Sequence, residues 1–294
     1  MPTIPNGFTP TVAAYSSDAP AGVLRTDVAG GVPRYGLEWD RGTQRFNVTL
    51  VLDATQYSVW VAFYHHLIKK GAIAFDMRLD TGLGTALHSC HIVPDSYSAT
   101  RTGGTVMVVA FVVETISAVY ALSDVAVAAY GLSSTVMPAG LTPLVQGYAL
   151  SDPGGVINSE VSGGVAAYAL EYFRGPQRFA CQLLLSPDQF ATWSVWFHRL
   201  IAKGAYTFDM PLDSGFGVQT HAANIVPGSY SATRTGGIHT LVSFAVEAEP
   251  KAYDLSTAEA QSMVDLYNLY GTGTDELLAA IAQFALVDSL VLDW

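Results

Sequence analysis

The nine residues SYSATRTGG occur twice in this chain, from Ser96 to Gly104 and again from Ser229 to Gly237. The same offset of 133 residues aligns 30–114 with 163–247 without a gap, and about half of the aligned positions are identical. A repeat of this length can bury its own core, whereas solenoid units of about 20–50 residues cannot stand alone. The duplication therefore predicts two homologous domains.

We place the first repeat at residues 1–133 and the second at residues 134–253, followed by a tail at residues 254–294. The net charge of −11 is concentrated in this tail, which holds seven acidic residues and no Lys or Arg. The first repeat holds ten acids and eight bases, and the second holds eight and six. A sequence-independent nucleic-acid binder needs a basic stripe. We therefore expect that DNA, where present, passes without specific binding.

Half of the residues are apolar and only 13% are charged. No apolar run approaches the ~18 residues that cross a bilayer, so we expect no membrane insertion, and the first twenty residues show no secretory signal. Cys90 and Cys181 occupy non-equivalent positions in the repeats, which indicates small buried residues made in a reducing compartment. The low charge favours a surface that partner subunits cover.

Each repeat opens with about thirty residues rich in Pro, Gly, Ser and Ala, which we expect to be extended or loop-like. Apolar and polar residues then alternate from Tyr35 to Leu52 and from Tyr168 to Leu185. This alternation around RGTQRF or RGPQRF predicts a hairpin-like strand pair.

A helix is predicted next in each repeat. Asp53 and Ser186 are N-cap residues, and each has a glutamine three positions later, as in a capping box. Lys70-Gly71 and Lys203-Gly204 are typical of the helix end. Apolar residues fall on one face at helical spacing: Tyr57, Trp60, Tyr64, Leu67 and Ile68, with Phe190, Trp193, Phe197, Leu200 and Ile201 in the second copy.

Three strands are predicted after each helix. The first, FDMRLD or FDMPLD, has a period of two, and Pro211 favours an edge position for the second copy. A Gly-x-Gly turn follows, then strands at 88–93 and 106–114, or 221–226 and 239–247. In the tail, a capping box from Ser256 to Glu259 opens a helix to about Tyr270, and a second helix is expected near Asp275.

The expected fold class is therefore α+β and mainly β. It comprises two homologous β-sandwich-like domains with one packed helix each, and a helical C-terminal tail.

Several titratable residues recur in both copies and were weighed for catalysis. A histidine with two carboxylates can bind a metal or perform acid–base chemistry, but no HExxH, CxxC or GxSxG spacing is present. We expect no enzyme activity and no cofactor, and keep a metal-dependent hydrolase as an alternative. The recurring pairs are His65 with His198, His88 with His221, Asp76 with Asp209, Asp80 with Asp213, and Glu114 with Glu247.

The nonapeptide combines hydroxyl groups, a tyrosine and one cation, Arg101 or Arg234. Such a loop could bind an acidic ligand. A bivalent receptor- or glycan-binding module, of a tail fibre or baseplate, is therefore the first alternative, and the metal-dependent hydrolase is the second. We favour an assembly arm that packs on another subunit. The residues assigned to it are Ser96, Tyr97, Thr100, Arg101 and Thr102, with Ser229, Tyr230, Thr233, Arg234 and Thr235 in the second copy.

The helix WVAFYHHLIKKG, followed by AIAFDMRLDTGLG and a histidine, resembles small virion proteins of tailed bacteriophages. The matching positions are Gln56, Trp60, Gly71, Phe75, Leu79, Gly82, Gly84 and His88, and Gln189, Trp193, Gly204, Phe208, Pro211, Leu212, Gly215, Gly217 and His221. The pattern is also similar to tail-tube, tail-terminator and hub proteins, which form rings around a DNA channel. The resemblance covers the core of both repeats and leaves out the acidic tail.

This resemblance implies a structural tail component in the virion, made in the host cytoplasm. Its partners would be copies of itself, other phage tail proteins, and DNA passing through. Because the domain is duplicated, a trimer with pseudo-sixfold symmetry is favoured over a hexamer. Acidic residues facing the channel would let DNA slide; the candidates are Asp76, Asp80, Asp209 and Asp213.

Overall fold

A computed structural model describes residues 1–11, 15–28, 33–159 and 164–271 of the chain. The fold is α+β and mainly β, as expected. The chain divides into two compact units. One comprises Met1–Asp213 with Gly217–Pro250 and so contains both repeats, and the other comprises Ser214–Phe216 with Lys251–Trp294. The predicted helix near Asp275 lies outside the described residues.

Five strands form the body of each repeat. In the first they are β4 (Thr43–Leu52), β5 (Phe75–Asp80), β6 (Thr85–Ile92), β7 (Ser98–Thr102) and β8 (Val106–Ile116). In the second they are β12 (Gln177–Leu185), β13 (Phe208–Asp213), β14 (Val218–Ile225), β15 (Ser231–Thr235) and β16 (His239–Ala248).

The strand register is also duplicated. All pairs are antiparallel, and each pair in the first repeat reappears 133 residues later: Phe75 faces Cys90 as Phe208 faces Ala223. β8 pairs with β4 along one edge and with β6 and β7 along the other, and β16 does the same with β12, β14 and β15. The nonapeptide is thus one arm of a hairpin in both copies.

The start of each repeat, expected to be extended or loop-like, contains two short strands, and a third follows directly. In the first repeat they are β1 (Ser16–Asp18), β2 (Val23–Thr26) and β3 (Arg34–Leu37). The second has β9 (Ala149–Leu150), β10 (Val156–Ser159) and β11 (Ala167–Leu170) at the same offset. Strands of two to four residues are too short to show a period of two, so the sequence indicates only extended chain here.

The hairpin expected between residues 35 and 52 is also wrong in its pairing. β3 pairs with β2, and β11 pairs with β10, each as a separate two-stranded sheet. Between β3 and β4, the chain at Gly42 comes so close to the carbonyl of Ala21 that a Cβ atom would lie 1.9 Å from its oxygen. Alternation identifies residues that lie in strands, but it does not identify their partners.

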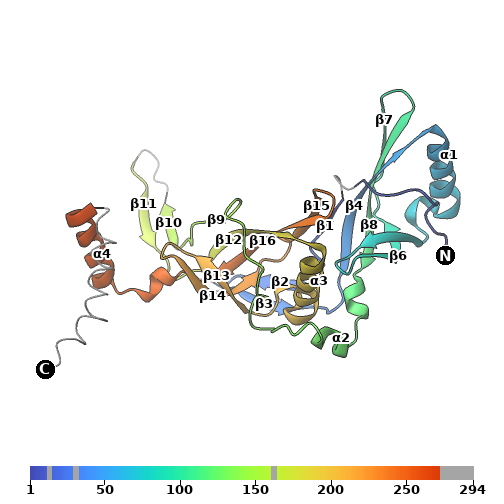
Figure 1. The fold of residues 1–294 in the computed structure, drawn as a ribbon. Helices are drawn as coiled ribbons and strands as arrows, with labels where there is room; N and C mark the ends of the chain where they lie inside the picture. Colours follow the sequence, from blue (N-terminus) through green and yellow to red (C-terminus); the bar gives the residue numbers. More distant parts are fainter. Residues whose placement is uncertain (12–14, 29–32, 160–163, 272–294) are drawn as a thin grey trace. The chain divides into compact units, whose positions relative to one another are not determined.

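One large sheet runs through both repeats. β1 pairs with β4 on one side and with β15 of the second repeat on the other, giving the order β13-β14-β16-β15-β1-β4-β8-β6-β5 (Figure 1). β13, which carries Pro211, is at one end of this order, as the proline predicts.

Each repeat has its own apolar core, centred on a helix. The capping boxes at Asp53 and Ser186 are both formed, and they open α1 (Ala54–Ala62) and α3 (Pro187–Val195). A π-helical turn follows each, at Phe63–Leu67 and Trp196–Leu200, and then a 3₁₀ turn, at Lys69–Gly71 and Ala202–Gly204.

The π-helical turn changes which side chains face the core. Trp60 and Ile68 are fully buried as predicted, but Leu67 is 56% exposed and Phe63 lies inside. A π turn holds more residues than an α turn, so the face calculated from 3.6 residues per turn no longer applies beyond it. Cys90 and Cys181 are buried free thiols, as predicted.

The segments that follow the last strand of each repeat also correspond. η4 (Ala118–Ala121) and α2 (Asp124–Ala128) follow β8, and η7 (Lys251–Asp254) and α4 (Thr257–Tyr270) follow β16 at the same offset. The predicted capping box opens α4. Sequence comparison missed this correspondence because, of residues 117–124, only Tyr120, Leu122 and Ser123 recur.

Candidate functional site: the contact between the two repeats

The contact between the repeats is centred on strand β1. Ser16, Ser17 and Asp18 of β1 face Thr233, Ala232 and Ser231 of β15. The Arg234 amide extends this ladder by donating to the Tyr15 carbonyl at 3.1 Å. Half of the second nonapeptide is therefore held by the first repeat through main-chain hydrogen bonds.

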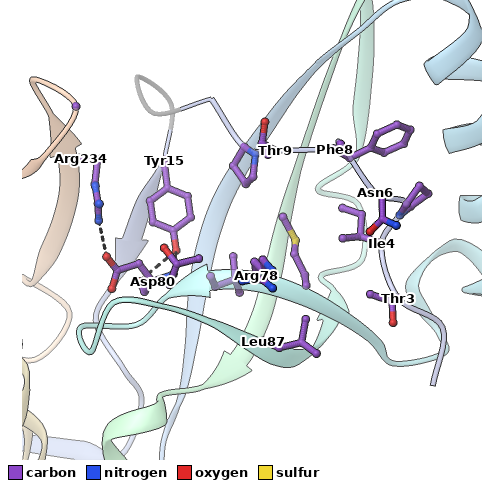
Figure 2. A pocket seen from close by; sticks show the side chains of 17 residues that line it. Thr3, Ile4, Asn6, Phe8, Thr9, Tyr15, Arg78, Asp80, Leu87 and Arg234 are labelled. Atoms are coloured by element: carbon purple, nitrogen blue, oxygen red, sulfur yellow. Dashed lines mark hydrogen bonds and ion pairs between the residues drawn. The ribbon is translucent and has the colours of Figure 1, made fainter.

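An ion pair and a tyrosine reinforce this strand pairing. Arg234 forms an ion pair with Asp80 of β5, whose side chain is 12% exposed. The Tyr15 hydroxyl accepts from the Asp80 amide at 2.9 Å and donates to its carbonyl at 3.2 Å. Burial raises the pKa of Tyr15 well above its ordinary value, so this hydroxyl stays protonated. Figure 2 shows Arg234 and Tyr15 meeting at Asp80, beside a cavity of about 470 Å³.

Lys203 contributes a second anchor between the repeats. Its ammonium donates to the carbonyls of Trp39, Ala21 and Asp40 at 2.7, 2.9 and 3.1 Å. Only 3% of this residue is exposed. Burial lowers the pKa of Lys203, which the charge of Asp40 partly opposes. The three acceptors are all main-chain atoms, so this contact depends on the path of the first repeat's backbone.

Glu247 forms a third contact, with strands β2 and β3. Its carboxylate accepts from Arg25 at 2.9 and 3.0 Å, from the Tyr35 hydroxyl at 2.5 Å and from Arg178 at 3.1 Å. Burial alone would raise the pKa of Glu247, but these hydrogen bonds outweigh burial and lower it. Glu247, weighed above as a catalytic candidate, thus binds residues of the other repeat.

The segment of the first repeat that follows β8 contacts the helix of the second repeat. His198 is 2% exposed, and its Nδ1 lies 3.1 Å from the Tyr120 hydroxyl. Burial, helped by the charge of Lys203, lowers the pKa of His198 to about 3, so the imidazole is neutral. Arg199 donates to the Leu122 carbonyl at 2.8 Å and to Asp124 at 2.7 Å. Tyr120 therefore provides a hydrogen-bond partner for this buried, neutral imidazole.

The equivalent surface of the first repeat is open. Ala99, Arg101, Lys70 and His65 are exposed, whereas their counterparts Ala232, Lys203 and His198 are buried and Arg234 is half-buried. For the strands that make the contact from the other side, the second repeat is the open one. β1, β2 and β3 of the first repeat contact the second repeat, whereas their counterparts β9, β10 and β11 are exposed along their whole length.

The first residues of each nonapeptide contact residues of their own repeat. Ser96 donates to the Val93 carbonyl at 2.6 Å, and Ser229 donates to that of Val226 at 2.7 Å. Tyr97 stacks on Tyr64, and Tyr230 stacks on Phe197. Of the proposed assembly residues, Thr233 and Arg234 contact the other repeat; Thr100, Arg101, Thr102 and Thr235 are exposed.

The four aspartates proposed to face a channel have two kinds of surroundings. The Asp76 amide and carbonyl bond to Pro2 and Ile4, and those of Asp209 bond to Thr135 and Met137. Asp80 contacts Arg234, so its carboxylate lies between the repeats instead of on a solvated strand face. Asp213 holds the position of Asp80, and the Tyr148 hydroxyl binds its main chain as Tyr15 binds that of Asp80.

Among the histidines considered for metal binding, His88 and His221 are buried. His88 lies 3.5 Å from the Thr81 hydroxyl, and burial lowers its pKa. His221 Nδ1 lies 2.8 Å from the Gln219 carbonyl. Within the described part of the chain, no three His, Cys, Asp or Glu side chains gather in an arrangement that could hold a metal ion.

Tyr15 and Lys203 were not predicted from the sequence to contribute to this contact, and Tyr148 is the counterpart of Tyr15 within the second repeat. Tyr15 and Tyr148 lie upstream of the aligned region, although the same offset relates them. Lys203 was interpreted only as a helix-ending cation. Their recurrence at this offset is the sequence signal that could have identified the tyrosines, but no sequence signal indicated that Lys203 and Lys70 differ in exposure.

No protein-family model matches this chain, and a search of curated proteins also finds no match. Among the described helices, none is both long enough and apolar enough to span a membrane.

Proposed function

We propose that this protein is a structural component of a bacteriophage tail, which assembles as a trimer into a ring around the DNA channel with pseudo-sixfold symmetry. One observation carries the proposal: two homologous repeats are joined through β1, and the strands equivalent to those that form this contact are exposed, β7 in the first repeat and β9 in the second. Repeating one contact generates a ring when the rotation closes.

The charge distribution supports a channel that does not hold DNA. The repeats are close to neutral, with ten acids against eight bases and eight against six, and the tail adds seven acids. A protein that threads DNA without binding it needs no cluster of phosphate contacts. The resemblance to phage tail proteins remains the basis for the virion assignment.

Electron microscopy of the purified full-length protein tests this function. We expect rings with six lobes and a mass of three chains, each of 31.3 kDa. The central opening should admit duplex DNA, and the ring should not retard DNA in a gel at physiological salt. Compact monomers at high protein concentration, or assemblies without an opening, would contradict the proposal.

The alternative of a bivalent ligand-binding module is less well supported. That function needs two similar sites built on Arg101 and Arg234, but Arg234 is paired with Asp80 while Arg101 is exposed. The two arginines would therefore bind an acidic ligand with different strengths.

A further inference from the structure

We infer that the first repeat of one chain binds the second repeat of another copy through the contacts that join the two repeats within a chain, with β7 pairing with the neighbouring copy's β9. The inference rests on the proposed function for closure into a ring. It goes further in naming the partner as a second copy and in specifying the residues that meet.

The first argument is that two complementary strand edges are open. All five residues of β7 are exposed, and its described pairing is with β8 alone. Both residues of β9 are exposed, and its described pairing is with β12 alone. Their counterparts β15 and β1 pair with each other inside the chain. Open strand edges readily add a further strand.

The register of the new pair follows from the internal one. β9 pairs with β12 in the same register as β1 with β4. Likewise, β7 pairs with β8 in the same register as β15 with β16. Transferring the β1–β15 pairing by 133 residues places Thr100, Ala99 and Ser98 opposite the neighbouring copy's Ala149, Leu150 and Ser151.

Side chains at this edge differ in a way that suits an interface between chains. Within the chain, Ser17 and Thr240 line one small cavity at the contact. Their counterparts are Leu150 and Met107, so both polar residues are replaced by apolar ones. Leu150 is 46% exposed in the single chain. Burying it beside Met107 would remove apolar surface from water, which favours association.

Lys70 is placed to repeat the anchor that Lys203 makes. Both lysines have the same left-handed backbone conformation, with φ of 62° and 61°. The carbonyls that Lys203 binds lie in a loop where the Glu38 and Trp39 amides donate to the Gly22 carbonyl. In the second repeat, the Glu171 and Tyr172 amides donate to the Gly155 carbonyl in the same way. Lys70 would thus meet the neighbouring copy's carbonyls of Gly154, Tyr172 and Phe173.

The β10–β11 hairpin supplies the remaining surface. Its counterpart, β2–β3, binds Glu247 of the second repeat through Arg25 and Tyr35. Tyr168 holds the position of Tyr35 and would reach Glu114, while Asn158 replaces Arg25 and cannot repeat its ion pair. Large apolar side chains of the hairpin are open to solvent in the single chain: Val156, Ile157, Tyr168 and Leu170.

Together these contacts make a head-to-tail interface, since each chain offers two different surfaces, one on each repeat. Head-to-tail contacts give a closed ring or an open filament, depending on the rotation between neighbours. Within a chain and between chains the rotation would be nearly the same, because the same contact is used. Successive repeats would then be nearly equivalent, whether they belong to one chain or to two.

Disulfide trapping tests the interface. Ala99→Cys and Leu150→Cys are introduced into separate full-length chains, which are mixed and oxidised with a mild thiol oxidant. Cα atoms of directly opposed strand residues are about 4.5–5.5 Å apart, within reach of a disulfide. We expect a covalent dimer that needs both variants. The matched control is Ser17→Cys with Ala232→Cys in one chain, which should crosslink internally and keep the monomer mass.

The outcomes separate this inference from the proposed function. A mixed-chain crosslink supports the interface even where microscopy shows open filaments. That combination would contradict the proposed ring and support the proposed contact between chains. Six-lobed rings with no such crosslink, while the internal control reacts, would overturn the interface and leave the ring function in place. The native cysteines do not confuse the result, since Cys90 and Cys181 are 0% and 1% exposed.

Discussion

At the scale of single residues, identical side chains have different surroundings in the two repeats. Arg234 is paired with a half-buried Asp80, whereas Arg101, in the same nonapeptide, is exposed and donates to the Gly104 carbonyl. His198 is buried against Tyr120, whereas His65 is exposed. The role of these residues therefore depends on which repeat they belong to.

Changing Arg234 to alanine should lower the free energy of unfolding by about 1–3 kcal/mol, because the Asp80 carboxylate loses its cationic partner. Arg101→Ala should change it by about 0.5 kcal/mol or less, as is usual for an exposed side chain. Urea denaturation of both variants, at a concentration where the protein is monomeric, measures the difference. Equal losses would show that the Arg234–Asp80 pair does not stabilise the contact.

Stability should fall with acid in a window set by His198. Its folded pKa of about 3 lies below the ordinary value of 6.5, so between these values the unfolded chain binds a proton that the folded chain does not. Folding is therefore disfavoured as the pH drops below 6.5, by up to about 1.4 kcal/mol per pH unit. Denaturation curves from pH 7 to 5 measure this slope.

His198→Gln is the control for this slope, because glutamine can still bond to the Tyr120 hydroxyl but does not titrate. The variant should have a shallower dependence on pH between 7 and 5. Glu247 acts only at lower pH: its folded pKa is lowered, so the stability it contributes is present above its unfolded value of 4.5 and is lost as the pH falls further. If His198→Gln leaves the pH dependence of stability between pH 7 and 5 unchanged, His198 is not the source of that dependence.

At the scale of elements, the sequence predicts best where a signal is local. The capping boxes at Asp53 and Ser186 and the alternation of Phe75, Met77 and Leu79 are all confirmed, because each depends on neighbours in the chain. Strand partners could not be predicted in this way. β1 has three residues and no pattern of its own, yet it joins the repeats, and only the fold brings Lys203 to the carbonyl of Ala21.

A proline in β1 should be more damaging than one in its counterpart. Ser17 lies between β4 and β15, while Leu150 has a described neighbour on one side only. Ser17→Pro should therefore cost about 2 kcal/mol or more in thermal or urea unfolding, since a strand with partners on both sides has little room for proline. Leu150→Pro should cost less in the monomer and should weaken self-association about tenfold or more. The reverse order would mean that β1 does not join the repeats.

At the scale of the whole molecule, the two cores are joined by contacts that include β1, the β2–β3 hairpin, Asp80 of β5 and the turn at Tyr120. The second repeat buries Ala232, Lys203 and His198 only with these segments in place. The sequence predicted the duplication, but it could not predict that the repeats share a sheet, because that depends on the open edge of β15 meeting β1.

This sharing predicts one cooperative unfolding transition for both repeats. Tryptophan fluorescence and far-ultraviolet circular dichroism should give coincident urea curves, because losing the contact exposes buried groups in both repeats. The variant Arg234→Ala should shift both curves together. Two separated transitions in the unmodified protein would show that each repeat unfolds alone.

The Lys203 anchor also bears on how such a chain can evolve. Because the lysine grips three main-chain oxygens, substitutions in the opposing loop leave its acceptors unchanged. Trp39 and Asp40 correspond to Tyr172 and Phe173, yet the loop keeps its hydrogen bonds to a glycine carbonyl. After the duplication, each repeat could therefore accumulate mutations independently and still bind the other repeat. One gene could then encode two repeats that differ in sequence and take different places in an assembly.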